Sequence, residues 1–163
     1  MARVWKFGDD VDTDQIVPGR YSPYMTSEAE LPKYAFIENR PEFAKEVKPG
    51  DIIVAGDNFG CGSSREYAPL ALKKCGIAAI IANSFARIFF RNAINLGIPL
   101  FEDAEAVQKL GDGEQVEVDA ARGFIRTAEG EITLRQPPKF VQDILAEGSI
   151  AGYVRKYQHF PGE

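Results

Sequence analysis

Residues 51–82, DIIVAGDNFGCGSSREYAPLALKKCGIAAIIA, contain two apolar runs that are separated by a glycine-rich loop and a helix-like segment. Residues 51–55 and 77–82 have the length and composition of buried strands. Residues 70–75 read as a helix, and Gly76 is well placed to end it. Strand, loop, helix and strand at this spacing indicate right-handed parallel crossovers, so this stretch predicts an α/β core.

The flanking sequence adds a short strand at residues 4–7 and a helix in PEFAKEV, which Pro41 would begin. The acidic segment GDDVDTDQIVPGRY, residues 8–21, suits a loop rather than a regular element. Ser84 is placed to cap an amphipathic helix in FARIFFRNAINL, and Gly97 precedes a strand in IPLFE. Arg87 and Arg91 on that helix could face a partner or an anionic site, but a solvated or ion-paired face is the simpler interpretation.

The second half of the chain has a different sequence pattern. QVEVDA, GFIRTA and EITLR, all between residues 115 and 135, have the pattern of short antiparallel strands joined by turns. PPKFVQDILAEG and the tail would then form helices. We therefore expect one domain spanning residues 1–163, in which helices flank a mixed sheet or open barrel.

Composition excludes several classes of protein. With 163 residues and 45% hydrophobic content, the chain is long enough to bury one sizeable core. The formal net charge of -5, without any basic run, argues against nucleic acid as a partner. The first residues lack the apolar core of a signal peptide, and the longest apolar run, residues 77–82, is far too short to cross a membrane. These features predict a soluble cytoplasmic protein.

Two cysteines, Cys61 and Cys75, and one histidine, His159, limit the chemistry of the chain. Two thiolates are too few to hold an iron–sulfur cluster or a structural zinc ion, so no metal site is expected on this chain. A single histidine in the C-terminal tail cannot supply a Ser-His-Asp triad or a multi-histidine metal site. We expect both cysteines to be packing residues.

The glycine-rich loop, residues 56–69, lies between a buried strand and a helix, where open α/β folds bind their ligands. Gly60 and Gly62 would allow the backbone to approach a ligand closely. A dinucleotide-binding loop is disfavoured, because Arg65 occupies the third glycine position and the next strand ends at Asn83 without an acid. A phosphate-binding loop would need a Gly-Lys-Ser/Thr sequence, and none follows.

The same loop also fits a helix capping box, Ser63-Ser64-Arg65-Glu66, in which the serine would only cap a helix. Pro69 argues against that interpretation, because with Ser63 as cap it would remove a hydrogen bond to the Arg65 carbonyl. We expect the helix to begin near Glu66, which would leave Ser63, Ser64 and Arg65 in the turn. Both interpretations stay open on these residues alone.

Three motifs in order, DTDQIVPGRY, GCGSSREYAP and NSFARIFFRNAINLGIPL, resemble the small subunits of the isopropylmalate isomerase and homoaconitase branch of the aconitase family. The likeness runs from the first strand to the C-terminus. It implies the swivelling β/β/α domain of that family. It also implies a hydro-lyase reaction, in which water is removed from a 2-hydroxy acid and added back with the hydroxyl on the neighbouring carbon.

The resemblance further implies a partner. In this family a [4Fe–4S] cluster is held by a separate large subunit, and the small subunit closes over it to complete the site. The expected partners are therefore that large subunit and a small hydroxy-acid substrate, with no cofactor bound by this chain. Whether the isolated chain self-associates is left open.

The resemblance assigns roles to residues of two motifs. Ser63 would be the base that takes a proton from the substrate carbon, its ionised form being favoured by cationic, N–H-rich surroundings. Ser64 would assist through its hydroxyl or backbone N–H, and Arg65 would bind a substrate carboxylate. Asp14 matches the family aspartate that orients a histidine of the large subunit.

Substrate choice in the family is attributed to the loop after the TD motif, here Arg20, Tyr21, Ser22, Pro23, Tyr24 and Met25. Homoaconitase-type loops present an arginine to an additional carboxylate, and Pro23 stands where that arginine is expected. Because an unpaired buried carboxylate is costly, this favours isopropylmalate, in leucine biosynthesis, over homocitrate, in lysine biosynthesis. Arg20 and the hydroxyls of Tyr21 and Tyr24 keep homocitrate, or another hydroxy diacid, open as the substrate.

Two hypotheses come from other classes of protein. An anion- or nucleotide-binding module without catalysis would bind its ligand without a partner. A purely structural subunit would use Ser63 only as a helix cap, so the loss of its hydroxyl would change stability and not turnover.

Overall fold

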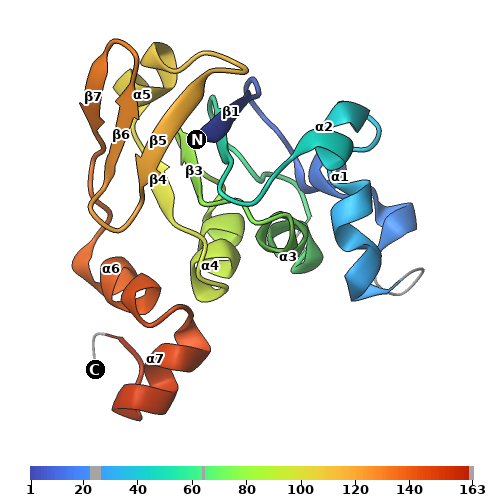
Figure 1. Cartoon of the computed structure of the whole chain (residues 1–163). Helices are drawn as coiled ribbons and strands as arrows, with labels where there is room; N and C mark the ends of the chain where they lie inside the picture. The colour runs from blue at the N-terminus through green and yellow to red at the C-terminus, as the bar shows by residue number, and fades with distance from the viewer. Residues whose placement is uncertain (23–26, 64, 162–163) are drawn as a thin grey trace.

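The computed structural model describes residues 1–22, 27–63 and 65–161. Seven strands form one mixed sheet in the order β4-β3-β2-β1-β5-β6-β7 (Figure 1). Its parallel half consists of β1 (Ala2–Lys6), β2 (Ile52–Ala55), β3 (Ala79–Ala82) and β4 (Leu100–Glu102). Its antiparallel half consists of β5 (Gln115–Asp119), β6 (Phe124–Thr127) and β7 (Gly130–Thr133). The expected α/β class and mixed sheet are confirmed.

The parallel strands alternate their side chains between two apolar cores. On one face Trp5, Ile53 and Ile80 are fully buried beneath helices. On the other face, side chains such as Val4, Ile52 and Ile81 share a core with α5 and the antiparallel strands. Both halves of the sheet therefore enclose this second core, and the sheet is curled rather than flat. Burial on both faces explains the continuous apolar runs that marked these strands in the sequence.

The helices that cover the first core come from the crossovers and from the C-terminal region. They are α2 (Pro41–Glu46), α3 (Tyr67–Lys74), α4 (Arg87–Asn95) and α6 (Lys139–Ala146), with α4 lying between α3 and α6 (Figure 1). α5 (Ala104–Lys109) belongs to the second core, and α7 (Ile150–Tyr157) extends beyond α6, away from the sheet. The helix that Pro41 begins was predicted, whereas α5 was not.

The prediction that residues 8–21 form a loop was wrong. Residues 8–21 are not all loop, because α1 (Thr13–Ile16) and a 3₁₀ turn (Gly19–Tyr21) form there. Asp12 and Gln15 cap α1 reciprocally, each side chain accepting from the backbone N–H of the other residue. A second 3₁₀ helix, Glu28–Tyr34, was also missed.

Ser84 does not cap α4. That helix begins at Arg87, and Ala86 occupies its N-cap position without a side-chain hydrogen bond. The Ser84 hydroxyl accepts instead from the backbone N–H of Asn58 at 2.8 Å. It therefore ties the start of α4 to the glycine-rich loop, which sequence spacing alone could not indicate.

Candidate functional site

The two loops that follow β1 and β2 run side by side at the carboxyl edge of the sheet. Because these strands are parallel neighbours, their ends meet at the same edge. The Gly60 N–H donates to the Val11 carbonyl at 2.7 Å, and the Thr13 N–H donates to the Cys61 carbonyl at 2.9 Å. The TD motif and the glycine-rich loop, separate in sequence, are thus joined by backbone hydrogen bonds.

Gly60 has a packing role in this arrangement. Its φ is +85°, and a Cβ there would lie 2.2 Å from Cγ of Phe89 in α4. The close approach that the sequence predicted for Gly60 is therefore to an aromatic ring. Phe89 also packs edge-on against Phe59, so the glycine-rich loop is held against α4.

Ser63 is exposed at the end of this loop. Its backbone carbonyl accepts from the Thr13 hydroxyl at 3.0 Å, which anchors it to the TD motif. Ser63 lines a hollow of about 190 Å³, the Ser63 hollow, whose lining also includes Thr13, Arg65, Arg87, Ile88 and Asn92. The serine thus borders a hollow whose lining includes two arginines.

The capping-box interpretation of Ser63 is wrong. Helix α3 begins at Tyr67, with Glu66 at the N-cap position and no side-chain capping bond. This confirms the expected helix start near Glu66. Ser63 and Arg65 therefore belong to the turn, where their side chains can contact a ligand.

Arg65 forms an ion pair with Asp14, which joins the two predicted motifs through side chains as well. The Arg65 side chain is 23% exposed and that of Asp14 is 63% exposed. The Arg65 guanidinium also lies beside Gly19, where a Cβ would be 3.3 Å from Nη1. Arg65 therefore contacts Asp14 of the TD motif and lines the Ser63 hollow together with Ser63.

The described part of the predicted specificity loop lies elsewhere. Arg20 pairs with Glu38 at 2.6 Å, and Tyr21 stacks on Tyr34 with ring centroids 4.2 Å apart. Ser22 is buried. None of these three residues lines the Ser63 hollow. Pro23 and Tyr24 of the same loop, and Ser64 of the turn, lie outside the described residues.

Sequence reasoning only partly anticipated the contribution of α4 to the hollow. It offered Arg87 as facing a partner or an anionic site but preferred a solvated or ion-paired helix face, and it did not consider Ile88 and Asn92. Spacing along α4 gives no sign of this role, because the contact depends on how Phe89 packs against Gly60.

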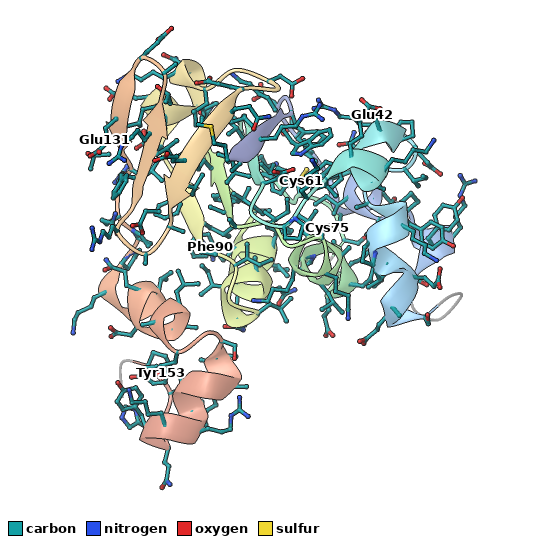
Figure 2. All side chains as sticks on the ribbon, in the orientation of Figure 1. Glu42, Cys61, Cys75, Phe90, Glu131 and Tyr153 are labelled. Atoms are coloured by element: carbon teal, nitrogen blue, oxygen red, sulfur yellow. The ribbon has the colours of Figure 1, made fainter. Side chains whose placement is uncertain are left out.

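The cysteines do not form a site. Cys61 lies in the glycine-rich loop and Cys75 at the end of α3 (Figure 2). Burial, with the charges of Asp12 and Asp10, raises the pKa of Cys61, and burial raises the pKa of Cys75 to about 12. Across residues 1–22, 27–63 and 65–161, no three His, Cys, Asp or Glu side chains are grouped in a way that could hold a metal ion. No helix within these ranges is long and apolar enough to cross a membrane.

Comparison with known proteins agrees with this geometry. Residues 11–103, which include both motifs and the whole of α4, match the aconitase C-terminal domain. The chain belongs to the aconitase family. The aconitase-family resemblance seen in the sequence is thereby confirmed.

Relatives of this aconitase-family chain carry names that differ in the substrate. The chain is 56% identical over 163 residues to the homoaconitase small subunit of Thermus thermophilus, covering 100% of both proteins. It is 50% identical over 163 residues to 3-isopropylmalate dehydratase small subunit 1 of Deinococcus radiodurans, covering 100% of this chain and 92% of the relative. The crystal structure of 3-isopropylmalate dehydratase from Methanocaldococcus jannaschii matches the fold with a TM-score of 0.87 at 45% identity, over 96% of this chain and 93% of that one.

Proposed function

We propose that this chain is the small subunit of a two-subunit hydro-lyase, which moves a hydroxyl group between neighbouring carbons of a hydroxy acid by dehydration and rehydration. The names of its full-length relatives support this assignment. The observation that carries it is the convergence of two loops, which sets the exposed Ser63 in a hollow with Arg65 and Arg87.

We assign to Ser63 the role of base. A serine hydroxyl is a weak acid, so its ionised form needs stabilisation by positive charge and hydrogen-bond donors. Arg65 and Arg87, which line the Ser63 hollow, would supply this positive charge. The ionised oxygen would take the proton from the substrate carbon in the dehydration direction, and return it in the hydration direction.

Arg65 is proposed to bind a carboxylate of the substrate. Its guanidinium has five N–H donors in a planar fork, so donors remain for a substrate while Nη1 contacts Asp14. Asp14 is exposed, and we propose that it also orients a histidine of the large subunit. We also propose, from the family resemblance alone, that Ser64 assists Ser63 through its hydroxyl or backbone N–H.

The iron–sulfur cluster of the family does not fit this chain. The chain has only two cysteines, which lie on different elements, so it cannot supply the three cysteine ligands that the cluster needs. We therefore assign the cluster to a large subunit and derive no step through it here. The Ser63 hollow is open to solvent, as expected for half of a site that a partner completes. In this proposal residues 1–163 act as one swivelling domain in the cytoplasm.

For the substrate we propose 2-isopropylmalate, which would place the chain in leucine biosynthesis. The support is Pro23 at the position where homoaconitase-type loops have an arginine. Homocitrate is the second candidate, favoured by the 56% identity to a homoaconitase small subunit. Steady-state kcat/KM on both acids, with the cognate large subunit, separates them. If Pro23 marks an apolar pocket, Pro23→Arg raises turnover of homocitrate relative to isopropylmalate, whereas an unchanged ratio places specificity elsewhere.

The role of Ser63 is tested by Ser63→Ala in the complex with the cluster-loaded large subunit. We expect turnover to fall by about 1,000-fold or more, with assembly unchanged. Ser27→Ala is a matched control, because Ser27 is exposed and its side chain makes no capping bond. Full turnover in Ser63→Ala would remove the assigned base and favour a structural subunit. Tight binding of NAD or another nucleotide to the isolated chain would favour the non-catalytic module.

A further inference from the structure

Arg87 lines three neighbouring hollows. One is the Ser63 hollow. The second, of about 620 Å³, lies between α4, the end of β4 and residues 135–138, and the third, of about 220 Å³, lies between α4 and α6. Phe90, labelled in Figure 2, lines the second and third hollows. Three hollows therefore meet at Arg87, and one of them is also lined by the proposed catalytic Ser63.

Three of the four arginines that line these hollows form no ion pair among the described residues. Arg3, Arg20, Arg40, Arg65, Arg122 and Arg126 all form ion pairs within the chain. Within the described ranges, Arg87, Arg91 and Arg135 form none, and all three line these hollows. Of the residues that the structure describes, Glu102 is the one acidic residue that lines the hollow shared by Arg87 and Arg135, so arginines outnumber carboxylates there although the chain carries a net charge of -5.

Exposed apolar side chains accompany these arginines. Ile88 of α4 is 51% exposed and Phe140 of α6 is 53% exposed. Ile88 lines the Ser63 hollow, and Phe140 lines the hollow between α4 and α6. Arginine together with exposed aromatic and aliphatic side chains is typical of the centre of a protein–protein interface. We call Arg87, Ile88, Arg91 and Phe140 the α4 face.

We propose that the α4 face docks on an acidic surface of the large subunit, an inference that rests on the proposed function. Carboxylates of the partner would pair with Arg91, and its apolar side chains would cover Ile88 and Phe140. Arg87, which also lines the Ser63 hollow, would keep its charge for that hollow. Because Arg87 and Ile88 also border the Ser63 hollow, docking here closes that hollow over the serine. The contact that assembles the enzyme would therefore also exclude water from its site.

Charge reversal at Arg91 tests the docking surface, because Arg91 does not line the Ser63 hollow. The measurement is the affinity of the full chain for the purified cognate large subunit. We expect Arg91→Glu to weaken binding by about tenfold or more, and the wild-type affinity to fall as NaCl rises from about 0.05 M to 0.5 M. Circular dichroism and thermal unfolding verify that the variant is folded.

Arg155→Glu is the matched control. Arg155 is also an exposed helical arginine without an ion pair among the described residues, but it lies on α7 outside the three hollows. Both variants change the net charge equally, so Arg155→Glu is expected to bind within about twofold of the wild type. Equal weakening by both variants, or none by Arg91→Glu, would overturn the docking surface.

Two further outcomes separate this proposal from others. If Ser63→Ala abolishes turnover while Arg91→Glu binds normally, the proposed function stands and the docking surface fails. If the isolated wild-type chain dimerises in sedimentation velocity and Arg91→Glu dissociates it, the α4 face is a contact between copies of this chain, and the proposal is wrong.

Discussion

The carboxylate of Asp14 pairs with the guanidinium of Arg65, although the two residues are 51 positions apart in the chain. Each belongs to a motif that the sequence marked as functional. Their meeting follows from the parallel pairing of β1 and β2, which brings the two loops to one edge of the sheet. The pair fixes the Arg65 side chain, which lines the same hollow as Ser63.

Asp14→Ala is expected to separate function from stability. An exposed ion pair contributes at most about 1 kcal/mol to folding, so the free energy of unfolding should change little. Turnover with the large subunit should fall by about 100-fold or more, because Arg65 and the partner's catalytic groups lose their orientation. Urea denaturation and steady-state assays measure the two effects. Loss of several kcal/mol of stability together with normal turnover would show that Asp14 is only structural.

Arg65→Lys should act on substrate binding. Lysine keeps the positive charge but cannot bind a carboxylate through two parallel N–H groups. KM should therefore rise by about tenfold or more, while the chain folds normally. Arg122→Lys provides the control, because Arg122 is 80% exposed and lies on the turn between β5 and β6. An unchanged KM for Arg65→Lys would mean that this guanidinium does not contact the substrate carboxylate.

Much of the fold could be predicted because buried parallel strands leave an unmistakable pattern. Ile52–Ala55 and Ala79–Ala82 are buried on both faces, and the sequence shows them as unbroken apolar runs. The order of the motifs likewise located Ser63, Arg65 and Asp14. Arg20 shows the limit of this approach, because it lies in a 3₁₀ turn, Gly19–Tyr21, and nothing in its local sequence indicates that it pairs with Glu38.

For a related reason, the sequence could not decide between the two interpretations of Arg87 on α4. Periodicity indicates which residues of a helix face its own core, but not which other loop the helix end meets. Here that contact is set by Gly60, whose lack of a side chain admits the ring of Phe89. Arg87 reaches the Ser63 hollow as a consequence of that single close approach.

Gly60→Ala should therefore be strongly destabilising. A methyl group there would overlap the Phe89 ring, and φ at +85° is unfavourable for any residue with a Cβ. We expect a loss of about 2 kcal/mol or more in the free energy of unfolding. Gly113→Ala measures the cost of the unfavourable backbone conformation alone, because φ there is +81° but nothing lies within 4 Å of the added carbon. Equal losses in the two variants would show that the Phe89 contact is not tight.

The two cysteines should differ in their reaction with iodoacetamide. Only the thiolate reacts, and burial raises the pKa of Cys75 to about 12, so Cys75 should stay unmodified near neutral pH while the chain is folded. Burial and the charges of Asp12 and Asp10 raise the pKa of Cys61, which is half-buried, so its labelling should be slow and should accelerate as pH rises. Mass spectrometry of the native chain at a series of pH values follows both thiols. In urea both should react at the rate of an ordinary cysteine, and rapid labelling of Cys75 without urea would show that the end of α3 opens in the native state.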